Sequence, residues 1–105
     1  MTVADKAPVA VNAYLPGEES YVKTISDLNK SVGDQKDSVL RPSERIAYER
    51  DMAVVNDTIK KMKTEVKRNP KNDSAKQILY SSYQNKIDLL NSVARKEELV
   101  ASLDD

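Results

Sequence analysis

The sequence predicts an all-α fold, an antiparallel three-helix bundle with up-down-up connections. Apolar residues recur at alternating steps of three and four, which places them along one side of a helix. Breaks that contain proline divide the chain into long segments. Tryptophan and phenylalanine are absent, so the chain has few of the residue types that favour β-strands. The alternative is a long hairpin of the second and third helices, with a shorter first helix docked on it.

The second predicted helix, about 43–68, carries the most regular apolar strip and is the expected centre of the bundle. The strip consists of Tyr48, Met52, Val55, Ile59, Met62 and Val66. Pro42 suits a first helical turn, and Ser43 is the expected N-cap. We expect this strip to meet the third helix on one side and the first helix on the other.

The first predicted helix, about 18–39, has a weaker strip. Its members are Tyr21, Ile25, Leu28, Val32, Gln35 and Val39. Gly33 in a helix interior costs about 1 kcal/mol. The helix is therefore expected to fray or kink after Val32.

The third predicted helix, about 73–97, follows a short turn at Asn69-Pro70 and must return beside the second helix. Asp73 or Ser74 is the expected cap. The apolar strip consists of Leu79, Tyr83, Ile87, Leu90 and Ala94, and Ile78, Tyr80, Leu89 and Val93 widen it. Acidic residues after Lys96 oppose the helix dipole, so we expect fraying there.

Residues 1–17 are predicted to be a flexible linker or tether, because prolines and Gly17 punctuate a stretch without helical period. Neither a signal peptide nor an apolar run of about 18 residues is visible. On this basis either the protein is cytoplasmic or these residues are cut from a longer chain.

The composition limits the chemistry that the chain can support. The 17 basic and 17 acidic residues cancel, so no overall field attracts nucleic acid or membrane. Without cysteine and histidine the chain lacks thiolate metal sites, cysteine nucleophiles and the commonest general base. No glycine-rich phosphate loop or nucleophile elbow is present. We therefore expect no catalytic, cofactor-binding or metal-binding residues and no small-molecule substrate.

Several groups of residues are candidate sites, and a structural role is favoured for each. The stretch 60–76 is basic and could bind an anionic partner, but dipole compensation at a solvated helix end explains it. Tyr48, Tyr80 and Tyr83 could line a pocket, but are expected in the core with their hydroxyls at its rim. Met52 and Met62 are expected to fill core gaps rather than bind metal.

The carboxylates form the last candidate group. They are Glu44, Glu49, Asp51, Asp57, Glu65 and Asp88. A catalytic pair requires two acids that converge in a dry cleft, where their pKa values separate. These residues fall mostly off the apolar strips, so a solvated helix face is the favoured interpretation.

One resemblance covers roughly residues 20–95. The matching residues are Tyr21, Ile25 and Leu28, then Leu40-Arg41-Pro42, then YERDMAVVNDTI at 48–59, then Arg68-Asn69-Pro70, and finally YQNKIDLL at 83–90. This order is similar to the extracytoplasmic C-terminal region of bacterial zinc-finger-type, membrane-anchored anti-sigma factors. The Asn69-Pro70 turn also resembles that of tetratricopeptide repeats, but no second copy follows.

The anti-sigma resemblance implies a regulator with a cytoplasmic zinc domain that binds a sigma factor, one membrane helix, and this helical module outside. The His-x-x-x-Cys-x-x-Cys motif and the membrane helix are absent here. The resemblance therefore implies that the chain is the periplasmic part alone, that Met1 is not the native start, and that residues 1–17 are the tether.

Two functions remain open from the sequence. The first is a non-enzymatic sensory or interaction module of an anti-sigma factor, which regulates transcription from outside the membrane. The second is a self-contained cytoplasmic helical adaptor, similar to a coiled coil or a tetratricopeptide repeat, that binds a partner protein or dimerises. For both functions we expect a protein partner or self-association, and for neither do we expect binding of a nucleic acid.

Overall fold

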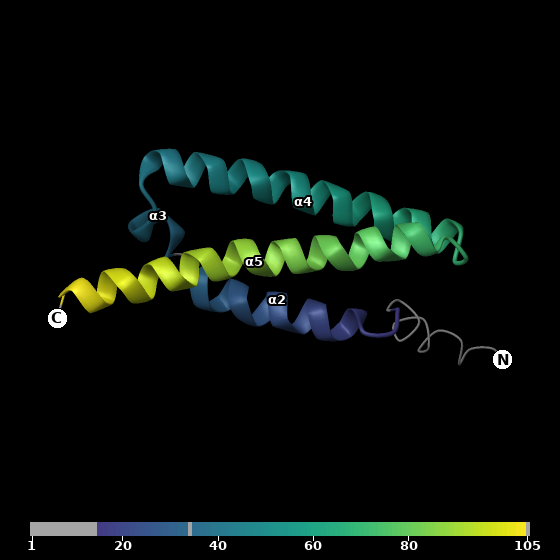
Figure 1. The fold of residues 1–105 in the computed structure, drawn as a ribbon, viewed down its shortest axis with the longest axis horizontal. Coiled ribbons are helices and arrows are strands. Elements are labelled where there is room, and N and C mark those ends of the chain that lie inside the picture. The colour runs from purple at the N-terminus through teal and green to yellow at the C-terminus, as the bar shows by residue number, and fades with distance from the viewer. Residues whose placement is uncertain (1–14, 34, 105) are drawn as a thin grey trace, which may run out of the picture.

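The computed structural model describes residues 15–33 and 35–104, except for the side chains of residues 101, 102 and 104. Its helices are α2 (Glu18–Val32), α3 (Lys36–Val39), α4 (Pro42–Arg68) and α5 (Asp73–Asp104). The described residues contain no strand, so the predicted all-α class is confirmed. The long helices α2, α4 and α5 run up, down and up along a molecule of 60 × 25 × 17 Å (Figure 1).

The helix that holds the bundle together is α5 and not, as predicted, α4. Figure 1 shows α5 between the other two long helices, and it packs against both, whereas α2 and α4 make little backbone contact with each other. Burial follows the same pattern. On α4 only Val66 is fully buried, whereas α5 buries Ala75, Leu79, Tyr83, Ile87, Leu90 and Val93. The wider apolar surface of α5 accommodates two partners, and the narrow strip of α4 accommodates one.

The first helical segment breaks where the sequence predicts a break. Helix α2 ends at Val32 with Gly33 as its C-cap, and Gly33 N donates a hydrogen bond to Asn29 O. The predicted first helix, about 18–39, is therefore too long, because its last residues form the separate short helix α3. The Lys36 side chain of α3 pairs with Glu49 of α4 at 2.6 Å.

The caps of α4 and α5 lie one or two residues earlier than predicted. Helix α4 begins at Pro42 with Arg41 as N-cap, and the Glu44 side chain accepts a hydrogen bond from Arg41 N at 2.8 Å. At the start of α5 the Asn72 side chain accepts from Ala75 N at 3.0 Å. Asn72 also donates to Glu65 Oε2 at 3.1 Å and so ties the turn to the end of α4.

Helix α5 continues past the predicted end near residue 97, and its last turns project beyond α3 and α4 (Figure 1). Near this end of α5, Lys96 forms an ion pair with Glu44 of α4 at 3.0 Å. Beyond it, Leu99 and Leu103 are 60% and 79% exposed. The acidic residues near this end do not stop the helix, although they oppose its dipole.

The burial pattern predicts that substitutions on α5 are the most destabilising. Leu90 is 1% exposed and belongs to the core cluster. Leu90→Ala is expected to lower the free energy of unfolding by about 2–5 kcal/mol, because it removes buried surface and leaves a cavity. Urea denaturation followed by circular dichroism measures this loss.

Ile46→Ala on α4 is the matched control, because Ile46 is 67% exposed. Its effect should stay within about 0.5 kcal/mol. Equal losses for the two variants would contradict the assignment of α5 as the core helix.

Candidate functional site

The most unusual feature of the described structure is a buried carboxylate at the start of α2. Glu18 is only 2% exposed. One carboxylate oxygen accepts a hydrogen bond from Leu15 N at 2.8 Å, and the other accepts from the Tyr83 hydroxyl of α5. A buried charged group is tolerated only when such donors replace water. The burial of Glu18 therefore depends on the docking of α2 against α5.

The backbone just before α2 is fixed to the same part of α5. The Tyr80 hydroxyl donates a hydrogen bond to the carbonyl oxygen of Pro16 at 2.7 Å. Gly17 follows with a φ of 86°, a left-handed conformation that glycine adopts without strain. This turn brings the chain from the Pro16 carbonyl into the helix that begins at Glu18. Residues 15–17, the described end of the predicted linker, are thus docked on the bundle.

Aromatic stacking completes this contact. The Tyr21 ring of α2 stacks on Tyr80 at 5.8 Å and on Tyr83 at 5.7 Å between ring centroids. Such pairs add about 0.5–1.5 kcal/mol beyond the area that they bury. We refer to Glu18, Tyr21, Tyr80 and Tyr83 as the Glu18 cluster. It joins the first turn of α2 to the first half of α5.

The environment of the cluster changes the acidity of Tyr80. Burial raises the pKa of the Tyr80 hydroxyl above its ordinary value, and the nearby Glu18 charge and Tyr21 raise it further. The Tyr80 hydroxyl therefore stays protonated to a higher pH than an ordinary tyrosine and remains a donor to the Pro16 carbonyl. Within the cluster the Tyr83 hydroxyl is thus a donor to Glu18, and the Tyr80 hydroxyl is a donor to the Pro16 carbonyl.

A cavity of about 300 Å³ adjoins the cluster between the start of α2 and the end of α4. Leu15, Val66 and Leu79 supply its apolar wall, and Lys63 and Lys67 supply its positive rim. A second hollow of about 370 Å³ shares these two lysines and continues along α4 past Ile59 and Lys60. Together they form what we call the lysine groove, lined by Leu15, Lys60, Lys63, Val66, Lys67 and Leu79.

The structure separates the three candidate tyrosines. Tyr80 and Tyr83 lie together against the core, as predicted. The Tyr80 hydroxyl bonds to the Pro16 carbonyl, whereas the Tyr83 hydroxyl is buried against Glu18 and is not, as predicted, at the rim of the core. Tyr48 is half-buried and lines a different hollow near Lys36 and Glu49. Met52 and Met62 also pack against the core cluster, as predicted.

Most of the candidate carboxylates contact basic side chains on the same helix or on a neighbouring helix. Five of these contacts are ion pairs with basic side chains: Glu44 with Lys96, Glu49 with Lys36, Asp51 with Arg50, Asp57 with Lys61, and Glu65 with Arg68. Hydrogen bonds from Asn72 and Arg68 lower the pKa of Glu65, and those from Arg41 and Lys96 lower the pKa of Glu44. Asp51 and Asp88 line one hollow between α4 and α5, but both are exposed to solvent.

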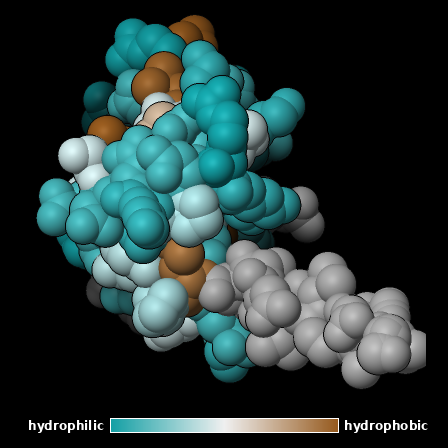
Figure 2. Space-filling view, turned by 90° about the vertical axis from the view of Figure 1, so that its right-hand side faces the viewer, coloured by the Kyte–Doolittle hydropathy of each residue, from teal (hydrophilic) through white to brown (hydrophobic). Residues whose placement is uncertain are grey.

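The basic stretch 60–76 surrounds the turn between α4 and α5. Figure 2 looks onto this end of the molecule and shows a largely hydrophilic surface with small separate apolar patches. Lys61, Arg68 and Lys76 have ion-pair partners there, namely Asp57, Glu65 and Asp73. The lysines of the groove have no such partner among the described residues.

The burial of Glu18 was not predicted, because an acid in the first turn of a helix suits the positive end of the helix dipole and gives no sign of burial. The signal that could have revealed it is topological. In an up-down-up bundle the first and third helices run in the same direction, so their starts lie at the same end. Glu18 and Tyr21 therefore had to lie near Tyr80 and Tyr83.

Comparison of the chain with models of protein families, with curated proteins and with solved structures finds no match. Within the part of the chain that the structure describes, no helix has the length and apolarity needed to cross a bilayer. No group of three or more acidic residues gathers there in a way that could hold a metal ion.

The Glu18 cluster predicts strong coupling between Glu18 and Tyr83. Tyr83→Phe removes one donor from a buried carboxylate and should cost about 1–3 kcal/mol of unfolding free energy. In the double variant with Glu18→Gln the losses should not add, with a coupling of about 0.5–3 kcal/mol. Urea denaturation of the four proteins in this cycle provides the measurement.

Tyr48→Phe is the control, since no described residue is bonded to the Tyr48 hydroxyl. It should change stability by no more than about 0.5 kcal/mol. Additive losses for Glu18→Gln and Tyr83→Phe would mean that their hydrogen bond contributes nothing.

The raised pKa of Tyr80 predicts a loss of stability in alkali. The protonated hydroxyl is favoured in the folded state, so its contribution is complete below the ordinary tyrosine pKa of about 10. It is lost as pH rises from there through the higher folded value. Urea denaturation at a series of pH values should show a steeper alkaline loss for the wild type than for Tyr80→Phe. Parallel curves would contradict the effect.

Proposed function

We propose that the chain is a non-enzymatic sensory and interaction module, and that it acts as the periplasmic part of a membrane-anchored anti-sigma factor that regulates transcription. The second half of this proposal rests on the resemblance of residues 20–95. The first half is supported by the arrangement of the helices and by the residue types available. The chain lacks histidine, the most frequent general acid-base residue, and cysteine, an intrinsically strong nucleophile.

The observation that carries the proposal is the position of the Glu18 cluster. It holds α2 on α5 at the point where the chain preceding residue 15 enters the bundle. A ligand, a partner or a protease that changes this docking would change the path of the preceding segment. Conversely, tension on that segment would act directly on Pro16 and Glu18. Helix α2 is thus the natural movable part, because its main packing partner is α5 alone.

The anti-sigma assignment is tested by the natural gene. We expect the reading frame to continue upstream of Met1 and to encode an apolar span of about 20 residues. A zinc-binding His-x-x-x-Cys-x-x-Cys motif should precede that span. A verified translation start at Met1 would refute the assignment.

The docking mechanism is tested in the full-length protein with a transcription reporter for the cognate sigma factor. Glu18→Lys places a cation in the buried site and should release α2, so we expect the reporter signal to change. Glu19→Lys is the matched control, since Glu19 is exposed on the same turn. A released α2, shown by proteolysis of the Glu18→Lys protein, together with an unchanged reporter, would refute this mechanism.

One observation favours the second function, an adaptor that binds a partner helix. A shallow hollow of about 450 Å³ lies between α4 and α5 and is lined by Val54, Val55 and Leu89. Val54 is 61% exposed, and Ile78, which lines a separate hollow of α5, is 45% exposed. Capture of one defined partner that Val54→Asp and Leu89→Asp both release would favour the adaptor.

A further inference from the structure

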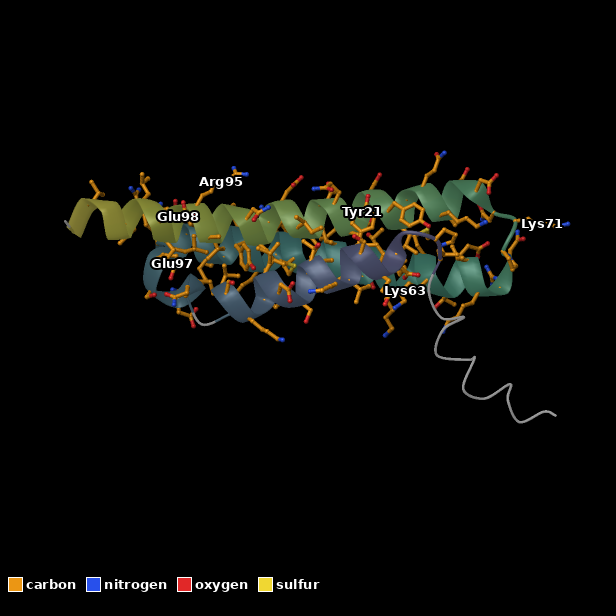
Figure 3. The ribbon with its side chains drawn as sticks, turned by 90° about the horizontal axis from the view of Figure 1, so that it is seen from below. Tyr21, Lys63, Lys71, Arg95, Glu97 and Glu98 are labelled. Atoms are coloured by element: carbon orange, nitrogen blue, oxygen red, sulfur yellow. The ribbon has the colours of Figure 1, made fainter. Side chains whose placement is uncertain are left out.

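Two surfaces of the chain match each other in charge and in apolar character. One is the lysine groove between the start of α2 and the end of α4. The other is the projecting end of α5, which we call the acidic end and define as Glu97, Glu98, Leu99, Val100 and Leu103. Figure 3 shows Glu97 and Glu98 at one end of the molecule and Lys63 toward the other. A single copy therefore cannot bring the two surfaces together without unfolding.

The groove offers uncompensated positive charge beside an apolar wall. Lys60 and Lys67 are exposed and Lys63 is half-buried, and no described carboxylate lies within ion-pair distance of any of them. The buried Glu18 also borders the cavity, but both of its oxygens already accept hydrogen bonds. The volume of about 300 Å³ is roughly that of ten water molecules, enough for a branched aliphatic side chain.

The acidic end offers the complementary features. Leu99, Val100 and Leu103 are 60%, 37% and 79% exposed. Val100 and Leu103 follow the buried Val93 by seven and ten residues, so they continue the core-facing side of α5 beyond the helices that cover it. These residues form an apolar strip that the described residues of the same copy leave exposed.

The charge of the acidic end is also unexplained within one copy. Glu97 and Glu98 lie near the negative end of the α5 dipole, and the last turn of α5 holds no basic residue to offset them. Helix dipoles account for the lysines at the end of α4 but give no reason for these acids. A cationic partner that covers the acidic end supplies the reason.

We propose that the chain self-associates, with the acidic end of one copy inserted in the lysine groove of another. Glu97 and Glu98 pair with the groove lysines, and Val100 or Leu103 enters the apolar cavity. The two surfaces differ, so the contact is heterologous and builds chains or closed rings. This inference does not depend on the anti-sigma assignment.

The test is sedimentation of the full chain over a range of concentrations. The wild type should associate at about 50 mM salt and much less at about 500 mM, because the contact depends on charge. Lys63→Glu with Lys67→Glu, or Glu97→Lys with Glu98→Lys, should each weaken association by about tenfold or more. An equimolar mixture of the two double variants restores both charge matches and should associate again. A single chain with all four reversals should also associate.

Lys23→Glu with Lys61→Glu is the matched control. It makes the same charge change at exposed lysines that pair with Asp27 and Asp57 outside the groove. This variant should associate like the wild type, and circular dichroism should show every variant folded. A wild type that remains monomeric at low salt would overturn the proposal. So would two double variants that are each folded and monomeric but do not associate when mixed.

Discussion

The structure depends on the width of the apolar surface of α5. Its buried residues, from Ala75 to Val93, span more of the helix circumference than one neighbouring helix can cover. Two helices are therefore needed, and α4 and α2 cover α5 from two sides. The strip of α4 is regular but narrow, and most of its members remain partly exposed. Regularity of a strip shows that a helix packs, whereas width shows how many partners it packs against.

The two contacts of α5 differ in kind. The contact with α4 is long, continues through the turn at Asn72, and is flanked by polar links such as Lys86 to Asn56 and Lys96 to Glu44. The contact between α5 and α2 is shorter. Near the start of α2, its polar and aromatic contacts are those of the Glu18 cluster. A buried carboxylate is stable only while its donors are in place. Docking of α2 should therefore be cooperative, with Glu18 either fully bonded and buried or released to water.

Much of this fold could be predicted from the sequence. The three long helices, the turn at Asn69-Pro70 and the break after Val32 follow from periodicity, proline and glycine, which act locally. The choice of α5 as the central helix could not be read from spacing alone, because it depends on which strips face each other. Fraying of α5 after Lys96 was also expected, but the helix continues to Asp104.

The candidate site was harder to predict than the fold. Tyr80 and Tyr83 were predicted to lie in the core with their hydroxyls at its rim. That Glu18 is the partner of Tyr83 was not predicted, because an acid in the first turn of a helix is usually solvated. Only the relative direction of α2 and α5 brings Glu18 to Tyr83. The lysine groove was visible as a basic stretch. That its lysines lack partners depends on which side of α4 faces α2, and the sequence does not determine this.

The central claim is that α2 is a separately docked arm on a more stable pair of helices, α4 and α5. Native-state hydrogen exchange of the wild-type chain at increasing urea concentrations tests it most directly. The account predicts that amides of α2 open together, at a lower free energy than amides in the middle of α4 and α5. A single opening free energy shared by the amides of α2, α4 and α5 would contradict it.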